Sequence, residues 1–375
     1  MNPHFWLFCT VIDNFGDVGV AWRLAQALAR KFDATVHLWL DDFSALQKIA
    51  PDAAQSIIQL HAWQEGQEID ISQFEIPQLV IETFACALPE NVVTLMAKHR
   101  ILWLNWEYLS AEDWAVRTHA MPSLQSNGAS KYFWQMGFLP ETGGLLREED
   151  LMTRANHYSQ HHAKNADLTF FLFGYQSPVW AKWLRIWQQF QRPLTLHLAD
   201  NKIINSLKAQ QFLPEHALIE SDVYHSGCLK LCRLPFVPQQ QFDELLWQAD
   251  ILMIRGEDSF VRAQYAGKPF MWHIYPQQEQ AHLEKLAAFW RLPLHLAQNN
   301  PVFTEIKTFQ AAFLALSDEL NGGQILDEKT CAQYWQILFD GLPIWRLLAQ
   351  NWRDYLWQQS DAMTRLATFL AEKTK

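Results

Sequence analysis

Residues 5–32 read "FWLFCTVIDNFGDVGVAWRLAQALARKF", and they contain the clearest structural pattern of the chain. The apolar run at 5–12 has the length of a buried strand, and "DNFGD" then supplies turn residues. From residue 18 to residue 32, apolar side chains recur at the spacing of a helix that buries one face. The stretch therefore predicts a strand, a loop and a helix, which is the opening unit of a sheet covered by helices.

The same alternation continues along the chain in two sets. The first set has strand-like runs at 34–40, 78–84 and 100–106, and the second has them at 167–175, 194–199, 251–254 and 270–275, with helix-compatible stretches between. Alternating strands and helices indicate parallel sheets, so we expect an α/β protein with two Rossmann-like halves.

The length of the chain also favours two domains, because 375 residues exceed the roughly 250–300 at which a single core stops growing. We expect an N-terminal domain at 1–155 and a C-terminal domain at 165–345, joined by the polar segment 145–166. The amphipathic helix at about 350–375 is expected to pack back on the N-terminal domain and complete it.

Composition narrows the class of protein. The net charge is -10 and no stretch strings together five Lys or Arg residues, so we expect no nucleic-acid partner. No run approaches 18 apolar residues and the start of the chain lacks a signal-peptide pattern, so we expect no membrane association and a cytoplasmic location. Five cysteines without a repeated pair spacing favour free thiols over a zinc site.

Four acidic residues follow strands of the first half. Asp13 and Asp17 come after the first strand, and Glu82 and Glu107 lie in the next two strand ends. Functional loops of such sheets follow the carboxyl ends of strands, so these carboxylates would form a pocket for a cation or a metal. Each also has a structural interpretation, as a helix cap for Asp17, a turn residue for Asp13 and a solvated edge residue for the two glutamates.

Two other site types are disfavoured. The Asp-x-Asp pattern common among divalent-cation sites for nucleotide sugars is absent, so we expect no metal and no other cofactor. "NFGDVG" lacks the leading Gly-x-Gly of a dinucleotide fingerprint, so an oxidoreductase is weakly supported.

In the second half, "RGEDSFVRAQYAGKPF" at 255–270 lies where the strand "ILMI" ends and a helix begins at about Ser259. Phosphates bind at such helix starts, and Arg255 could hold a diphosphate through its two-pronged guanidinium. Glu257 and Asp258 would then face ribose or sugar hydroxyls, or else serve as ordinary acids of a first helical turn.

Aromatic residues from neighbouring loops flank this stretch, namely Tyr175, Phe236, Phe242 and Tyr275. Each is either a core residue or a stacking platform for a base or sugar. Gln239 carries the donor and acceptor pair that reads a pyrimidine edge.

Six motifs together resemble the protein-arginine rhamnosyltransferases of bacterial elongation factor P, the EarP family. They are "VIDNFGDVGVAWRLA", "IETFACALP", "NWEYLSAEDW", "MGFLPETGGLLRE", "LPFVPQQQFDELLWQADI" and "RGEDSFVRAQYAGKPFMWHIYPQ". The resemblance runs from residue 5 to the C-terminal helices. It implies a GT-B fold, with an acceptor-binding N-terminal domain and a nucleotide-sugar-binding C-terminal domain.

The activity implied is inverting transfer of L-rhamnose from dTDP-β-L-rhamnose to one arginine side chain of elongation factor P, without a metal. The modified factor would be active on ribosomes stalled at polyproline. Asp13 and Asp17 match the paired catalytic aspartates of the family, and Asn14, Glu82 and Glu107 would complete the acceptor pocket.

The resemblance also assigns the donor site to residues of this sequence. The pyrimidine would lie among Phe236, Gln239 and Phe242, and the diphosphate near Arg255, Ser259 and Tyr275. Tyr175, Glu257 and Asp258 would complete the site. One departure is Tyr265, where family members often carry Trp, and it affects no catalytic position.

Two alternatives stay open. A non-catalytic module would bind a nucleotide sugar or a protein arginine and tolerate the loss of Asp13 and Asp17. An oxidoreductase would bind a nicotinamide cofactor, for which the sequence offers no fingerprint.

Overall fold

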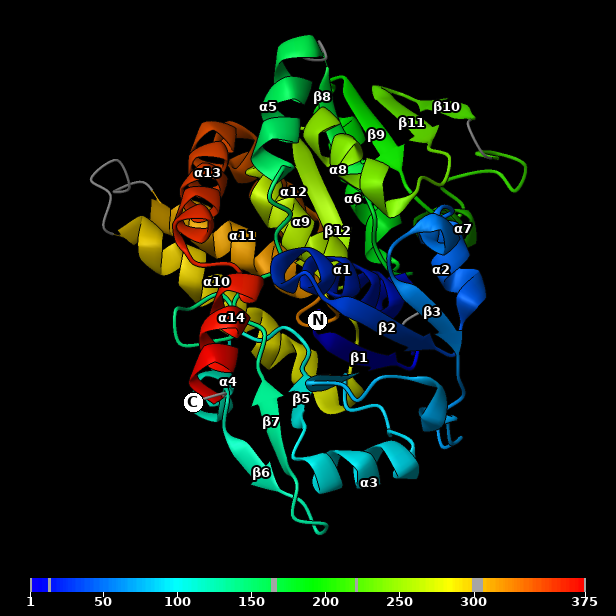
Figure 1. Ribbon diagram of the computed structural model, residues 1–375. Helices are drawn as coiled ribbons and strands as arrows, with labels where there is room; N and C mark the ends of the chain where they lie inside the picture. Colours follow the sequence, from blue (N-terminus) through cyan, green and yellow to red (C-terminus); the bar gives the residue numbers. More distant parts are fainter. Residues whose placement is uncertain (1, 13–14, 163–166, 220–221, 299–305, 374–375) are drawn as a thin grey trace. The chain divides into compact units, whose positions relative to one another are not determined.

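The computed structural model describes residues 2–12, 15–162, 167–219, 222–298 and 306–373. The chain splits into two compact units (Figure 1). Unit 1 comprises Met1–Leu151, Pro238–Gln240 and Gln359–Lys375, and unit 2 comprises Met152–Val237 and Gln241–Gln358.

Unit 1 contains a seven-stranded sheet in the order β3-β2-β1-β4-β5-β7-β6, parallel except for the β6–β7 hairpin. Its strands are β1 (His4–Cys9), β2 (Thr35–Leu40), β3 (Gln59–Ala62), β4 (Leu79–Thr83), β5 (Leu102–Trp106), β6 (Pro122–Leu124) and β7 (Ser130–Trp134). Its helices are α1 (Phe15–Phe32), α2 (Phe43–Ile49), α3 (Glu90–His99), α4 (Asp113–Thr118) and the C-terminal α14 (Ala362–Lys373), with short 3-10 turns at Ala53–Gln55 and Ile71–Gln73.

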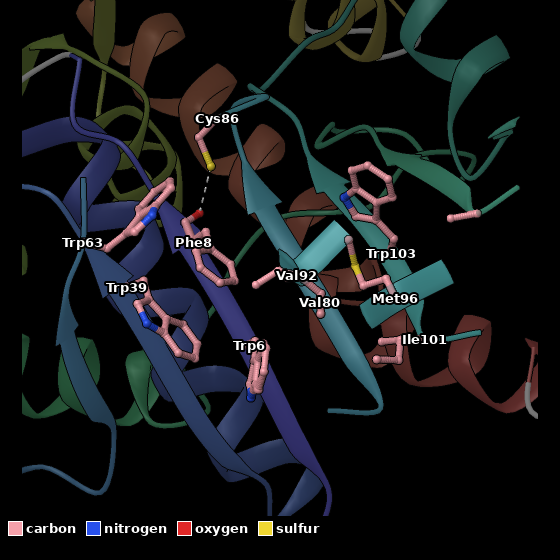
Figure 2. Packing of buried hydrophobic residues seen from close by; sticks show 11 residues of the cluster. Trp6, Phe8, Trp39, Trp63, Val80, Cys86, Val92, Met96, Ile101 and Trp103 are labelled. Atoms are coloured by element: carbon pink, nitrogen blue, oxygen red, sulfur yellow. Dashed lines mark hydrogen bonds between the residues drawn. The ribbon is translucent and has the colours of Figure 1, made fainter. Parts of the chain in front are cut away.

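Both faces of this sheet are covered, which explains the unbroken apolar run of β1. On one face, Phe5 packs edge-on against Phe32 of α1. On the other face, Trp6 and Phe8 join a buried cluster with Trp39 (Figure 2). The rings of Phe8 and Trp39 stack with centroids 4.6 Å apart.

Unit 2 contains a six-stranded sheet in the order β10-β11-β9-β8-β12-β13, parallel except for the β10–β11 pair. Its strands are β8 (Leu168–Leu172), β9 (Leu194–Leu198), β10 (Val223–Ser226), β11 (Leu229–Arg233), β12 (Ile251–Arg255) and β13 (Phe270–His273). Its helices are α5 (Leu151–His161), α6 (Val179–Gln189), α7 (Asn201–Ala209), α8 (Gln239–Gln248), α9 (Asp258–Ala266), α10 (Ala281–Gln298), α11 (Ile306–Leu320), α12 (Glu328–Asp340) and α13 (Leu342–Gln358), with a 3-10 turn at Gln278–Gln280.

Tryptophan fills the cores. Ten tryptophans are fully buried, among them Trp183 and Trp187 of α6, which pack edge-on against Trp335 of α12. Within the described ranges, no helix combines the length and apolarity needed to cross a membrane.

The C-terminal helix α14 belongs to unit 1, as expected. Phe369 packs edge-on against Tyr132 and Trp134 of β7. Arg365 donates through Nη1 to three backbone oxygens, those of Leu139, Pro140 and Thr142, at 2.6 to 3.0 Å. The expected α/β fold with two Rossmann-like halves is confirmed, and α14 (red in Figure 1) completes the first half.

Candidate active site

Among the parallel strands of each described sheet, the strand order changes direction once. In unit 1 this switch point lies between β1 and β4, and in unit 2 it lies between β8 and β12. Open α/β sheets bind their ligands at the carboxyl ends of the strands at such positions. The residues that follow these four strands are therefore the first candidates in each unit.

Asp17 lies in the first turn of α1, after β1, and is buried, with 3% of its surface exposed. Its Oδ2 accepts a hydrogen bond of 2.8 Å from the backbone N–H of Ile12, which holds the loop against the helix. Asp13 and Asn14, the other two candidates of this loop, lie outside the described residues.

Tyr108 is a neighbour of Asp17 that the sequence did not indicate. It follows β5, and its hydroxyl donates to Asp17 Oδ1 at 3.3 Å. Its ring stacks on Phe84, with centroids 4.1 Å apart. Phe84 and Ala85 after β4 have left-handed backbone angles, with φ of 57° and 58°. Such strain in residues with side chains is typical of functional sites.

Glu82 is buried and its carboxylate has two partners. Lys131 Nζ lies 2.8 Å from Oε1, and the indole N–H of Trp103 donates to Oε2 at 3.1 Å. Burial raises the pKa of Glu82, although its bond to Lys131 acts in the opposite direction. Lys131, which sequence reasoning missed, partly neutralises the acidic pocket expected here.

Glu107 lies at the end of β5 and accepts a hydrogen bond of 2.6 Å from Asn105 Nδ2. Asn105 in turn accepts from the backbone N–H of Ala85, so the amide fixes the strained β4 loop. Burial, and then the negative charge of Glu82, raise the pKa of Glu107. Glu107 therefore lies close enough to Glu82 for the charge of Glu82 to act on it.

In unit 2, the switch point brings together Tyr175 and Arg255. The Arg255 guanidinium lies 5.0 Å from the centre of the Tyr175 ring and 4.4 Å from that of Phe173. Arg255 Nη2 pairs with Asp200 Oδ2 at 2.6 Å, and Lys202 Nζ lies 4.9 Å from the Tyr175 ring centre. Asp200 and Lys202, which follow β9, were not among the expected site residues.

His273 supports this cluster from the end of β13. It is 3% exposed, and burial, followed by the charges of Arg255, His282 and Lys202, lowers its pKa to about 3. The neutral ring accepts a hydrogen bond of 3.2 Å at Nδ1 from the backbone N–H of Tyr175. It therefore fixes the loop that carries Tyr175.

The "GEDS" segment forms the start of α9, one residue earlier than expected. Glu257 occupies the cap position and pairs with Lys285 at 2.8 Å. Asp258 pairs with Arg262 at 3.2 Å, in a network that continues to Asp243. Both acids thus have protein partners, and Ser259 lies in the first turn, half-buried.

The remaining donor-site candidates lie on three segments of the chain. Phe236 and Tyr275 are exposed, at 49% and 53%, and Tyr275 packs edge-on against Tyr175. Phe242 packs against Phe173. Gln239 is the first residue of α8. The Arg255 guanidinium therefore lies against the rings of Tyr175 and Phe173, and Tyr275 and Phe242 pack on these two rings in turn.

Comparison with known proteins identifies the family. Residues 5–371 match the model of the family described as elongation factor P (EF-P) rhamnosyltransferase EarP. The chain belongs to the EarP family. A protein-arginine rhamnosyltransferase of Neisseria meningitidis serogroup B is 46% identical, with 99% of this chain and 97% of that protein covered. One of Pseudomonas aeruginosa is 36% identical, with 98% of each covered.

Solved structures agree with this assignment. A structure of EarP, described as the basis of arginine glycosylation of translation elongation factor EF-P, matches with a TM-score of 0.67 and 26% identity, over 98% of this chain and 99% of that one. MurG of Acinetobacter baumannii matches in fold, with a TM-score of 0.55, 12% identity and 99% of each chain covered. The resemblance, the GT-B fold and the enzyme class, protein-arginine rhamnosyltransferase, are confirmed.

Proposed function

We propose that this member of the EarP family transfers L-rhamnose from dTDP-β-L-rhamnose to an arginine side chain of elongation factor P, with inversion at the anomeric carbon. The reaction takes place in the cytoplasm, and the modified factor acts on ribosomes stalled at polyproline. The observation that carries the proposal is the buried Asp17 at the switch point of unit 1, held by Ile12 N and Tyr108 OH.

The acceptor requires carboxylates. An arginine side chain is cationic and its delocalised nitrogens are poor nucleophiles. A carboxylate can bind the guanidinium, localise its charge and accept a proton as the C–N bond forms. We assign the base to Asp17 and orientation of the guanidinium to Asp13, and we assign the rest of the acceptor pocket to Asn14, Glu82 and Glu107. The Tyr108 hydroxyl fixes the Asp17 carboxylate and makes Tyr108 a positioning residue.

A nucleotide-sugar donor needs a cation for its diphosphate and aromatic rings for its base. In this assignment Arg255, with Ser259 and Tyr275, holds the diphosphate and stabilises it as it leaves the anomeric carbon. The thymine lies among Phe236, Gln239 and Phe242. Glu257, Asp258 and Tyr175 complete the site. Because the Arg255 guanidinium neutralises the leaving group, the reaction proceeds without a metal or other cofactor.

The product of the reaction tests the proposal. Elongation factor P is incubated with the enzyme and dTDP-β-L-rhamnose in the presence of a chelator, and the modified residue is examined by NMR. We expect an α-linked rhamnose on one arginine nitrogen and an unchanged rate with the chelator. A β-linkage would contradict inversion, and loss of the rate that added Mg²⁺ restores would contradict metal independence.

A further inference from the structure

The charged side chains around Tyr175 include a carboxylate as well as the cation assigned to the diphosphate. Asp200, the residue before α7, places a carboxylate at the carboxyl end of β9, beside the ends of β8 and β12. Its Oδ2 lies 2.6 Å from Arg255 Nη2, and the side chains of Asp200 and Arg255 are 22% and 13% exposed. The guanidinium assigned to the donor is thus paired with an internal anion.

Lys202 adds a second cation to the same place. Its Nζ lies 4.9 Å from the centre of the Tyr175 ring, and the Arg255 guanidinium lies 5.0 Å from the same centre. The charges of both residues act on His273, whose neutral ring adds no further charge. The cluster therefore contains two cations, one carboxylate and the aromatic rings of Tyr175 and Phe173.

The carboxylate in this cluster affects ligand binding, because a nucleoside diphosphate would bind its negative charges to the same two cations. A guanidinium binds carboxylate and phosphate through the same planar fork, so Asp200 and a diphosphate compete for Arg255. A carboxylate that stays beside a bound diphosphate also repels it, by an amount that partial burial increases.

We propose that Asp200 occupies Arg255 when the donor site is empty, and that it weakens diphosphate binding at Arg255 and Lys202 so that the nucleoside diphosphate product leaves after transfer. This inference rests on the proposed function, since it takes the donor to be a nucleoside diphosphate sugar. It adds Lys202 as a second diphosphate-binding cation and Asp200 as a residue that sets the rate of product release.

An alternative role for Asp200 is purely structural. Its Oδ1 also caps α7, accepting a hydrogen bond of 2.9 Å from the backbone N–H of Lys202. Asn caps helices about as well as Asp, so Asp200→Asn retains the cap while removing the charge. If Asp200 only held Arg255 in place for the donor, Asp200→Asn would weaken the binding of dTDP. If Asp200 competes with the diphosphate for Arg255, the same substitution should strengthen it.

The test measures binding of dTDP by calorimetry and its release by stopped-flow displacement. We expect Asp200→Asn to bind dTDP about tenfold more tightly and to release it more slowly. Its kcat should fall while kcat/KM for the donor is retained, because product release then limits turnover. Lys202→Met should weaken dTDP binding about tenfold or more.

Matched controls separate local from general charge effects. Asp327→Asn changes the cap of α12, where the side chain accepts from Thr330 N, and Lys208→Met changes another lysine of α7. Both should leave dTDP binding unchanged. Weaker or unchanged dTDP binding by Asp200→Asn would overturn the inference and leave the proposed function intact. A wild-type chain that does not bind dTDP would contradict both.

Discussion

Asp17 is held by groups that an amide can also satisfy. The backbone N–H of Ile12 donates to one oxygen of its carboxylate and the hydroxyl of Tyr108 donates to the other. An asparagine keeps an oxygen that accepts from Ile12 N–H, and its NH2 group can donate to the Tyr108 hydroxyl oxygen. Replacement by Asn therefore removes the negative charge and the proton acceptor while leaving the volume of the side chain unchanged. This makes the residue suitable for separating chemistry from folding.

We expect Asp17→Asn to lower kcat for arginine rhamnosylation by about 100-fold to 10,000-fold, because it removes a general base. Its affinity for dTDP should stay within about twofold, since the donor candidates other than Gln239 lie in unit 2. Initial rates and calorimetry measure the two quantities. Near-normal turnover by Asp17→Asn would contradict its assignment as the base.

Gly174 shows how tightly the Tyr175 loop is packed. A Cβ at this position would lie 2.4 Å from Trp180 Cζ2 and 3.0 Å from His273 Nδ1. We expect Gly174→Ala to destabilise unit 2 by about 1–3 kcal/mol, because the buried ring of Trp180 has to move. Displacement of Tyr175 should weaken dTDP binding about tenfold. Denaturant unfolding and calorimetry measure both effects, and a variant that matches the wild type in both would contradict this account of the loop.

Among the elements, strands β2 and β3 at one edge of the unit 1 sheet carry histidines that stack on aromatic rings. His37 of β2 lies against Trp39 and His61, and its Nδ1 is 3.0 Å from His61 Nε2. Burial, and then the charges of His61 and His4, lower the pKa of His37 to about 4. The edge is therefore stable only while His37 is neutral.

This edge predicts sensitivity to acid. An unfolded histidine titrates near 6.5, so the stability tied to neutral His37 is present above that pH and is lost as the pH falls toward 4. At pH 5 the loss amounts to about 2 kcal/mol. His37→Phe should show a smaller decrease in Tm between pH 7 and pH 5 than the wild type, measured by calorimetry. An equal decrease in both would contradict the role of His37.

Strong local patterns explain which elements the sequence predicted. The strand and helix at 5–32 were predicted because β1 is buried on both faces and α1 on one, so the apolar spacing is clear. The hairpin of β6 and β7 was missed, because β6 has only three residues, with Leu124 exposed at 77%, and β7 carries Lys131. Such short, half-exposed strands have no distinct period.

In the candidate site too, only some of the residues could be predicted from the sequence. Residues at or after the ends of strands whose other residues are almost all buried, such as Asp17 and Arg255, could be selected from the sequence. Tyr108 and Asp200 could not, because their contacts join residues 91 and 55 positions apart. Such pairs depend on strand order, which a single sequence does not provide.

In the chain as a whole, unit 1 takes up the first 151 residues, the short segment Pro238–Gln240 and finally Gln359–Lys375. Helix α14 buries Leu366 completely, and Arg365 binds three carbonyl oxygens of the 139–142 loop. Unit 1 therefore depends on the last helix of the chain.

A chain that ends at Gln358 should lose rhamnosylation activity, because unit 1 loses the buried surface and hydrogen bonds of α14. It should still bind dTDP within about twofold of the full-length chain, since unit 2 remains whole. Thermal unfolding with and without dTDP provides the measurement. Full activity without α14 would contradict its role in unit 1, and loss of dTDP binding would contradict a donor site formed mainly by unit 2.

The reaction expected of this chain is the transfer of L-rhamnose to an arginine of elongation factor P. It is tested most directly by the intact mass of elongation factor P from the same source, after incubation with the enzyme and dTDP-β-L-rhamnose without added metal. We predict a gain of one deoxyhexosyl group, which is absent with dTDP-glucose or with Asp17→Asn. An unchanged mass, with dTDP-rhamnose binding still seen by calorimetry, would contradict the claim and favour a non-catalytic binding module.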